Sequence, residues 1–372
     1  MPRRFCLARA VALALALPLA LTAPLAGQGA SLAGFKWSGF AEVSYTTSNH
    51  ADGDIVVGRL YDRFQDQFML NALALSLDKA YDPAKRSAGF HAEILFGQNA
   101  AVIKSGGFDL GGQGDIPHLY VTLNLPTGSG NGVQFKVGRI PTLMGLEVIE
   151  TTANPNSSEG NQFILVENFT GLGLSVETKF SDKLDVQLRM INGWDLVREN
   201  NLSKSYMARV GIYPDANTSI SLLGFFGPEQ GGDNSASRSG AEVLVWRRLG
   251  KTAVWLQGDV GSEEANGALP DPTQAAQWWA LGAWLAYDVT STLGLAVRGD
   301  YVNDENGART SAFVGFPTNT GHDLWSATAT LNIRSWPGAL VRPELRYDHS
   351  SLASFDGEQS QITLALSVAY TF

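Results

Sequence analysis

The last twelve residues constrain the fold of this chain more than any other stretch. From Gln361 to Phe372, the even positions carry Ile, Leu, Leu, Val, Tyr and Phe, and the odd positions carry polar or small residues. This period-two alternation predicts a β-strand with one apolar and one polar face. A tilted transmembrane strand has this pattern and length, but so does a half-buried strand of a soluble sandwich. The segment alone leaves both interpretations open.

The connections between the predicted strands decide between these two folds. We predict about sixteen strands, at residues 35–47, 66–77, 88–99, 116–125, 132–140, 169–180, 183–193, 204–213, 217–227, 239–249, 251–260, 275–287, 291–302, 323–335, 338–348 and 360–372. Even-numbered links are mostly short turns, and odd-numbered links are long and polar. Outer-membrane barrels have short periplasmic turns and long extracellular loops, with aromatic residues at both strand ends. The pattern therefore predicts an all-β fold, a transmembrane antiparallel β-barrel.

The N-terminus reads as a secretory signal peptide over residues 1–33. A basic start is followed by an Ala/Leu run from Ala10 to Leu21 and by small residues, with cleavage expected between residues 26 and 33. The barrel then occupies residues 34–372 as one domain, located in the bacterial outer membrane. Cys6, the one cysteine, lies in the leader, so the mature chain has no thiol for disulfides, catalysis or metal binding.

The charge balance and the lack of long apolar runs narrow the range of partners. The chain has 27 basic and 36 acidic residues, and loss of the leader removes three of the arginines. An acidic exported protein is a poor partner for nucleic acid. No apolar run after residue 34 reaches the 18 or more residues of a membrane helix. The expected partners are outer-membrane lipid and small hydrophilic solutes or ions.

The polar faces of the strands predict the inner wall of a water-filled pore, because a barrel this wide cannot be filled by its own side chains. The predicted wall residues are Lys136, Arg189, Arg209, Arg298, Arg342, Glu344 and Arg346. Facing of strands 66–77 and 217–227 stays open, because both of their faces are apolar.

The longest link, residues 141–168, predicts a pore constriction. Long loops in compact proteins are usually functional or disordered. We expect this loop to fold into the barrel and to place Glu147 and Glu150 opposite the basic wall. Opposed acidic and basic rows filter solutes by charge and size. In the alternative, the loop acids are solvated outside, and the arginines pair with Glu344, Asp300 and Asp185 as structural ladders.

Several short motifs give the chain a family resemblance. They are Gly138-Arg139-Ile140-Pro141, Gly145-Leu146-Glu147, Asn154-Pro155-Asn156, Glu167-Asn168-Phe169-Thr170-Gly171, Ser181-Asp182-Lys183-Leu184, Asn192-Gly193-Trp194-Asp195 and Tyr213-Pro214. In these, the chain resembles the OmpL-like β-barrel porins of bacterial outer membranes, most closely over residues 115–230. The resemblance implies a porin-type channel. It supplies no set of functional residues, so the pore residues rest on the alternation alone.

Enzyme and metal sites are weakly indicated. The pairs His322-Asp323 and Asp348-His349 fall near the loop-side rim, but no Gly-x-Ser-x-Gly nucleophile motif is present. Asp52-Gly53-Asp54 and Asp304-Glu305-Asn306 are rich in oxygen ligands but lack the spacing of a calcium loop. We therefore expect no catalytic residues, no metal site and no cofactor.

The sequence thus favours an outer-membrane porin, a passive diffusion channel for small hydrophilic solutes. A non-conducting barrel, plugged by its loops and serving in adhesion, as a receptor or as a structural protein, is the alternative. Wide porin barrels often trimerise, so a homotrimer also stays open.

Overall fold

The computed structural model describes residues 31–32, 34–50, 53–127, 132–265, 274–312 and 315–372. The predicted leader, apart from residues 31–32, lies outside the described residues. So do Asp52 of the candidate calcium loop, residues 128–131 of one predicted turn and residues 266–273 of one long loop.

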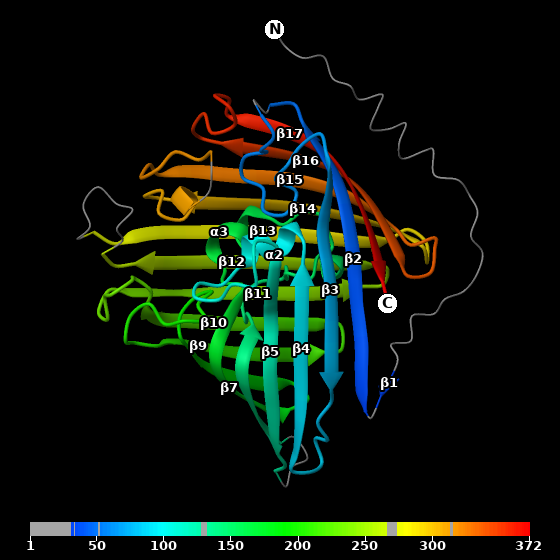
Figure 1. Ribbon diagram of the computed structural model, residues 1–372, viewed down its shortest axis with the longest axis vertical. Helices are drawn as coiled ribbons and strands as arrows, with labels where there is room; N and C mark the ends of the chain where they lie inside the picture. Colours follow the sequence, from blue (N-terminus) through cyan, green and yellow to red (C-terminus); the bar gives the residue numbers. More distant parts are fainter. Residues whose placement is uncertain (1–30, 33, 51–52, 128–131, 266–273, 313–314) are drawn as a thin grey trace.

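A closed antiparallel barrel forms the body of the protein (Figure 1). Each strand from β2 to β17 pairs with its neighbours in sequence, and β17 pairs with β2 to close the ring. The sixteen strands are β2 (Phe35–Ser48), β3 (Phe68–Lys79), β4 (Ser87–Phe96), β5 (Gly114–Leu125), β6 (Val133–Pro141), β7 (Thr170–Ser181), β8 (Leu184–Ile191), β9 (Ser205–Asp215), β10 (Thr218–Pro228), β11 (Ser237–Leu249), β12 (Thr252–Glu263), β13 (Ala276–Asp288), β14 (Leu293–Asp304), β15 (His322–Ile333), β16 (Ala339–Ser350) and β17 (Ser360–Thr371). The predicted sixteen-strand barrel is confirmed.

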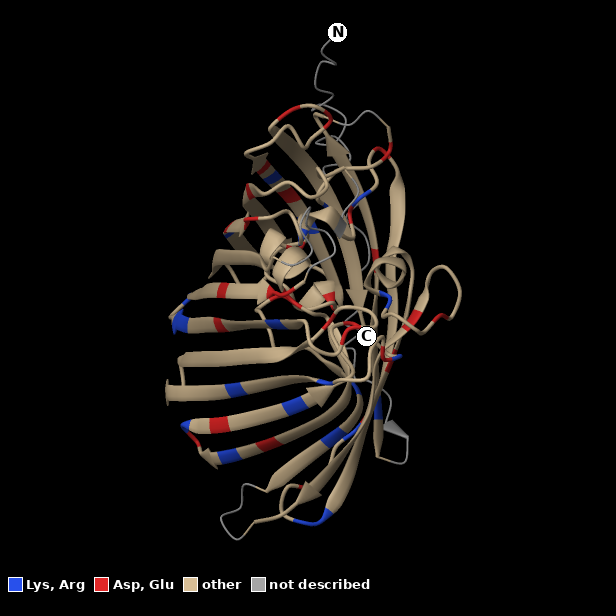
Figure 2. Cartoon of the chain, turned by 90° about the vertical axis from the view of Figure 1, so that its left-hand side faces the viewer, with Lys and Arg blue, Asp and Glu red and all other residues tan. Residues whose placement is uncertain are grey.

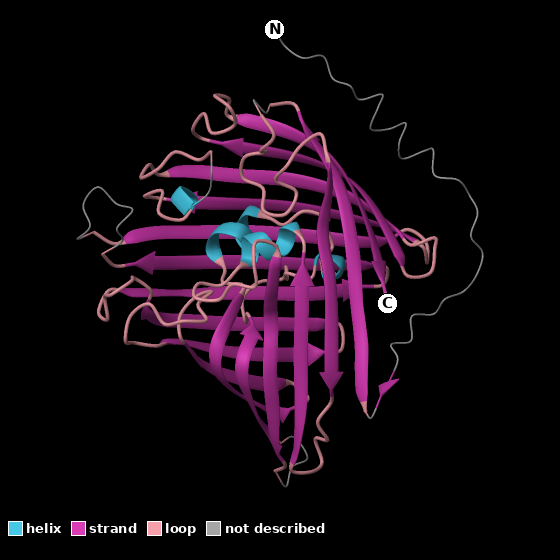
Figure 3. Cartoon of the chain, viewed as in Figure 1, coloured by secondary structure: helices cyan, strands magenta, loops and turns pink. Residues whose placement is uncertain are grey.

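A few short elements accompany the wall. The two-residue strand β1 (Ser31–Leu32) pairs with the start of β2. Helices α2 (Gln98–Ile103) and α3 (Asn161–Val166), with the 3-10 turns η1 (Thr151–Ala153) and η2 (Thr310–Ala312), occur in the long loops. Figure 3 shows the helices within the outline of the strands. No helix in the described part of the chain is long and apolar enough to cross a membrane.

Alternation along the strands gives the wall an apolar outside and a polar inside. Opposite each other on the outer face of β16 and β17 lie Leu345 and Leu364, whereas their neighbours Arg346 and Thr363 are buried inside. Exposed aromatic residues lie at both strand ends, such as Tyr287 on the turn side and Trp325 on the loop side. Figure 2 shows acidic and basic positions on the strands and in the loops.

A β-bulge explains why the facing of β3 is unreadable from its sequence. Glu42 of β2 pairs with Ala72 and Val43 pairs with Leu70, so Asn71 is an extra residue. The bulge inverts the parity, because one inserted residue moves every later side chain to the other face. Leu70 and Leu73 are both exposed in consequence, and Asn71 is buried with its amide on the Tyr61 carbonyl oxygen.

The inside of the barrel also holds apolar side chains. In β10, Leu222 and Phe226 are exposed, whereas Leu223 and Phe225 are buried with Trp194. A larger cluster joins side chains of α2, α3 and the first long loop, including Ala100, Ile103, Phe163, Leu165, Leu60 and Tyr61. Loop residues therefore fill part of the lumen that the sequence predicted to contain water.

The outer face predicts a depth-dependent cost for charge. Leu188, midway along β8, is 54% exposed and outward-facing, and Phe180 lies near the turn-side end of β7. We expect Leu188→Arg to destabilise the barrel by about 2–4 kcal/mol, but Phe180→Arg by only about 0–1 kcal/mol, because the cost of a charge falls toward the interface. Denaturant unfolding in lipid vesicles, followed by tryptophan fluorescence, measures both; equal costs would contradict this placement in the bilayer.

Candidate functional site

The segment 142–169, between β6 and β7, contacts the inner wall far from its own strands. Its backbone amides donate to inward carboxylates and amides of three strands: Gly145 to Glu242 Oε2 at 2.7 Å, Leu146 to Gln257 Oε1 at 3.1 Å, and Ser157 to Glu344 Oε2 at 2.7 Å. All six residues of α3 are buried. The segment thus lies against the inner faces of β11, β12 and β16.

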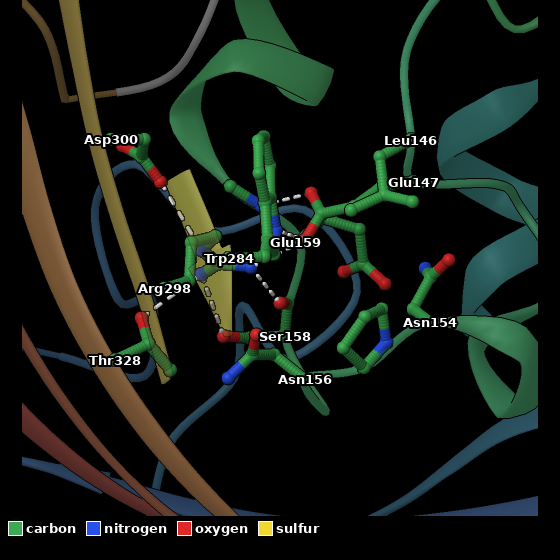
Figure 4. A network of polar contacts seen from close by, with 12 residues as sticks. Leu146, Glu147, Asn154, Asn156, Ser158, Glu159, Trp284, Arg298, Asp300 and Thr328 are labelled. Carbon is green, nitrogen blue, oxygen red and sulfur yellow. Dashed lines mark hydrogen bonds and ion pairs between the residues drawn. The ribbon is translucent and has the colours of Figure 1, made fainter. Parts of the chain in front are cut away.

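Arg298 of β14 forms the centre of a buried polar network (Figure 4). Its Nη1 lies 2.6 Å from Glu147 Oε1 and donates to the Ser158 carbonyl oxygen at 2.5 Å, and its Nε lies 3.1 Å from Asp300 Oδ2. The Trp284 indole also donates to Glu147 Oε1, at 3.2 Å. Arg298 and Glu147 are completely or almost completely buried, so this ion pair fastens the segment to the wall.

Two further arginines bind the backbone of the same segment. Arg342 donates to the Thr151 carbonyl at 2.8 Å and to Glu42 Oε1 at 2.7 Å. Arg346 donates to the Glu159 carbonyl at 2.6 Å. Both side chains are fully buried. These predicted wall residues therefore direct their charge into the segment and its carboxylate partners.

Glu344, the acidic member of the predicted wall, acts in the same region. Its carboxylate accepts hydrogen bonds from the Ser157 and Ser158 amides and from the Thr330 hydroxyl, at 2.7, 3.2 and 2.6 Å. It does not pair with Arg342 or Arg346 in the described residues. Its hydrogen bonds instead fix the turn that precedes α3.

Glu150 forms its ion pair with a histidine and not with the buried arginines. Its Oε1 lies 3.2 Å from His118 Nδ1 on β5, on the opposite part of the wall from Arg298. Burial acts to raise the pKa of Glu150. The hydrogen bond from His118 and the positive charge of that histidine outweigh burial and hold the pKa of Glu150 below its ordinary value. Glu147 and Glu150 thus fasten the segment at two different places.

The other predicted basic residues lie on β6, β8 and β9, and two of them, Lys136 and Arg209, are less covered than the three arginines above. Lys136 pairs with Glu177 at 2.9 Å, and Arg209 pairs with Asp185 at 3.0 Å, with all four side chains between 12% and 27% exposed. Arg189 is more deeply buried and donates to the Pro141 carbonyl at 2.5 Å. This part of the wall keeps charged side chains in contact with solvent.

A second long loop, between β2 and β3, also contacts the inner wall, which was not predicted from the sequence. Gln361 of β17 donates to the Val57 carbonyl at 2.8 Å, and Arg59 lies 2.5 Å from Asp62 and 3.8 Å from Asp348. The signal was present in the apolar residues Val56, Val57, Leu60 and Tyr61, which are unusual in a solvated polar loop. All four are buried.

Glu159 has an unusual environment. Its side chain is buried and neither carboxylate oxygen has a hydrogen-bond partner among the described residues. Burial, reinforced by the nearby charge of Glu147, raises the pKa of Glu159 well above its ordinary value. The uncharged acid is the form that this environment favours, because burial penalises an unpaired charge.

The two His–Asp pairs near the rim do not form a cluster. His349 is on the outer face, with its ring centroid 5.6 Å from that of Trp325, whereas His322 is buried. Strand alternation likewise separates each histidine from its neighbouring aspartate. Of the second candidate calcium loop, Asp304 accepts hydrogen bonds from the amides of 308–310, so its carboxylate caps a turn.

A family model described as "Putative beta-barrel porin-2, OmpL-like" matches residues 34–372. The chain belongs to this family. The predicted family resemblance is thereby confirmed over the whole barrel. Membership places the protein in the bacterial outer membrane, as the sequence predicted. No curated protein sequence matches the chain.

Solved outer-membrane channels share the fold. The DcaP channel of Acinetobacter baumannii is 13% identical with a TM-score of 0.59, over 93% of this chain and 100% of that one. The anion-selective porin of Comamonas acidovorans is 10% identical with a TM-score of 0.59, over 91% and 99% of the two chains. The trimer form of OmpT from Vibrio cholerae is 11% identical with a TM-score of 0.58, over 91% and 99%. At sequence identities this low, the structural similarity shows that these proteins share a fold with this chain and nothing more.

Asp195, in the loop after β8, links the end of the segment to its neighbours. Its Oδ1 accepts hydrogen bonds from the Phe169 and Thr170 amides, both at 2.8 Å. Burial raises the pKa of Asp195 to about 6, and these two hydrogen bonds and Arg139 limit the rise.

Asp195→Asn tests this electrostatic arrangement. An acid whose pKa is raised on folding stabilises the fold below its unfolded pKa, and this contribution is lost as pH rises through about 6. We therefore expect the variant, which keeps an acceptor for both amides, to melt higher than the wild type at pH 7, with a difference that shrinks toward pH 4. Heat-modifiability on gels from pH 4 to 8 measures this; a constant difference would contradict it.

Proposed function

We propose that the protein is a passive diffusion channel for small hydrophilic solutes, with segment 142–169 as its constriction. The carrying observation is that three buried wall arginines bind this segment through its carbonyls and Glu147. A segment held so firmly across the lumen narrows the passage at a fixed size. Diffusion down a gradient needs neither a cofactor nor a covalent step, so we assign no enzymatic activity.

The passage runs beside the inner faces of β6, β8 and β9 in this proposal. The segment covers the wall at β11–β16, whereas Lys136, Glu177, Arg209 and Asp185 remain partly exposed. Solutes would meet paired charges of both signs there. Charged rows at a narrow place act on passing ions, so these pairs are the groups that set selectivity. Glu147 and Glu150 contribute by fastening the segment.

The remaining features of a porin fit the same proposal. The family match begins at residue 34, next to the expected signal cleavage region. The exposed apolar outer face suits contact with outer-membrane lipid. A homotrimer, the assembly named for the OmpT structure, is proposed for this chain as well. Chemical cross-linking in isolated outer membranes is expected to give a three-subunit band; a monomer alone would contradict it.

A plugged barrel is the second candidate. The observation that favours it is the apolar cluster inside the lumen, formed by α2, α3 and Val57, Leu60 and Tyr61. If these loops close the passage, the protein would serve in adhesion, as a receptor or as a structural protein. Conductance separates the two candidates.

Two arginine variants test the constriction. Arg298→Gln removes the donor to Ser158 and the ion pair to Glu147, so we expect a looser segment and a higher, noisier single-channel conductance in planar bilayers. Arg209→Gln is the matched control, because Arg209 contacts Asp185, Ser221 and Tyr213 but no residue of the segment. It should leave the conductance nearly unchanged and shift the reversal potential toward cations, since it removes a partly exposed positive charge.

The outcomes are distinct. Unchanged conductance in Arg298→Gln would show that the segment does not limit the passage. A folded wild-type barrel without conductance would leave the plugged candidate. An unchanged reversal potential in Arg209→Gln would move the passage away from β9.

A further inference from the structure

Two histidines and a glutamate come together on the inner face of β4 and β5. His91 and Glu93 lie on β4, and Glu93 pairs directly across the strands with His118 of β5. Each of the three offers one ligand atom, and these atoms all lie within 4.8 Å of one another. His118 and Glu93 are buried, and the side chain of His91 is 18% exposed.

In both histidines, the Nδ1 atom of the ring contacts a carboxylate. Asp78 Oδ1 lies 2.7 Å from His91 Nδ1, and Glu150 Oε1 lies 3.2 Å from His118 Nδ1. A carboxylate that accepts the Nδ1 proton leaves the lone pair on Nε2, the arrangement that orients histidines toward a metal ion. Asp78 and Glu150 are therefore positioning residues.

One of the three candidate ligands presents a buried nitrogen that has no hydrogen-bond partner in the part of the chain that the structure describes. His118 Nε2 is buried and has no hydrogen-bond partner among the described residues, and the side chain of His118 is only 4% exposed. A buried polar atom is normally paired. Glu93 accepts one hydrogen bond, from the Ser76 hydroxyl to Oε2 at 2.9 Å. In the described part of the chain no lysine or arginine forms an ion pair with Asp78, Glu93 or Glu150.

We propose that His91, Glu93 and His118 bind a divalent transition-metal ion of the zinc type. Two imidazole nitrogens and one carboxylate oxygen are a donor set that zinc accepts, leaving a fourth position for water or a solute. Zinc ligands in a tetrahedral site are about 3.4 Å apart. Because the three ligand atoms lie within 4.8 Å of one another, zinc binding would draw them together by at most about 1.4 Å. Calcium is excluded by chemistry, because it prefers six to eight oxygen ligands.

The local backbone fits a built site. Glu93 pairs with His118 but Leu95 pairs with Asp115, so β5 carries an extra residue directly beside His118. Bulges of this kind redirect a side chain and recur next to functional sites. The proline at position 117 fits the bulge, since proline is confined to such irregular places within sheets.

Metal binding to the refolded, untagged mature barrel in detergent tests the proposal. After chelator dialysis, titration with zinc chloride in a calorimeter is expected to give one ion per barrel, unaffected by excess calcium. His91→Gln and His118→Gln should abolish this binding. Glu150→Gln should weaken it about 10–100-fold, the usual effect of losing a carboxylate behind a ligand histidine. Cobalt(II), as a spectroscopic probe, should give visible bands in the wild type and none in His118→Gln.

His349→Gln is the matched control, because His349 lies on the outer face away from these residues. Heat-modifiability of every variant establishes that the barrel is folded. Absence of stoichiometric zinc binding in the folded wild type would overturn the proposal, as would binding that survives in His118→Gln. Neither result depends on conductance, so failure here is distinguishable from failure of the channel function.

Discussion

Closure of the hydrogen-bonded ring is the constraint on which the other features depend. A backbone that crosses lipid must satisfy all its amides and carbonyls internally, and an antiparallel ring without a free edge does so. The pairing of β17 with β2 completes this ring. Because each strand then has one face toward lipid and one toward the lumen, polar side chains are concentrated inside. The buried network of the interior follows from the closure.

That interior is organised by guanidinium groups in contact with both carboxylates and backbone carbonyls. Arg298, Arg342 and Arg346 are fully buried, and burying an isolated charge is very costly. Each has an acidic partner, and the rigid, forked donors of arginine reach carbonyl oxygens of the segment as well. Loss of one arginine would leave buried acids unpaired. The segment position is therefore coupled to the wall chemistry, which a solvated loop would not be.

The strands were predictable because alternation is a local signal, and all sixteen appear close to their expected positions. The facing of β3 was not predictable, since the inserted Asn71 inverts the parity without any mark in the sequence. Arg298 and Glu147 could be named as candidates from composition and alternation, but their pairing depends on a contact between residues far apart in the chain. Glu150 was expected to face the arginines, but its carboxylate contacts His118 of β5. Interior burial of residues 56–61 had a signal in their apolar character, although the long polar loop around them obscured it.

His118 connects the inner face of the barrel wall with segment 142–169. It lies at a bulge in the wall, and it is also the residue that holds Glu150 of the segment. An ion ligated by Nε2 withdraws electron density from the ring and makes the Nδ1 proton a stronger donor, so the bond to Glu150 strengthens with binding. A ligand can change an equilibrium only through a difference in its affinity for the two states. An ion that prefers the state with Glu150 in place would therefore stabilise the fastened segment, and it would link the proposed metal site to the proposed constriction.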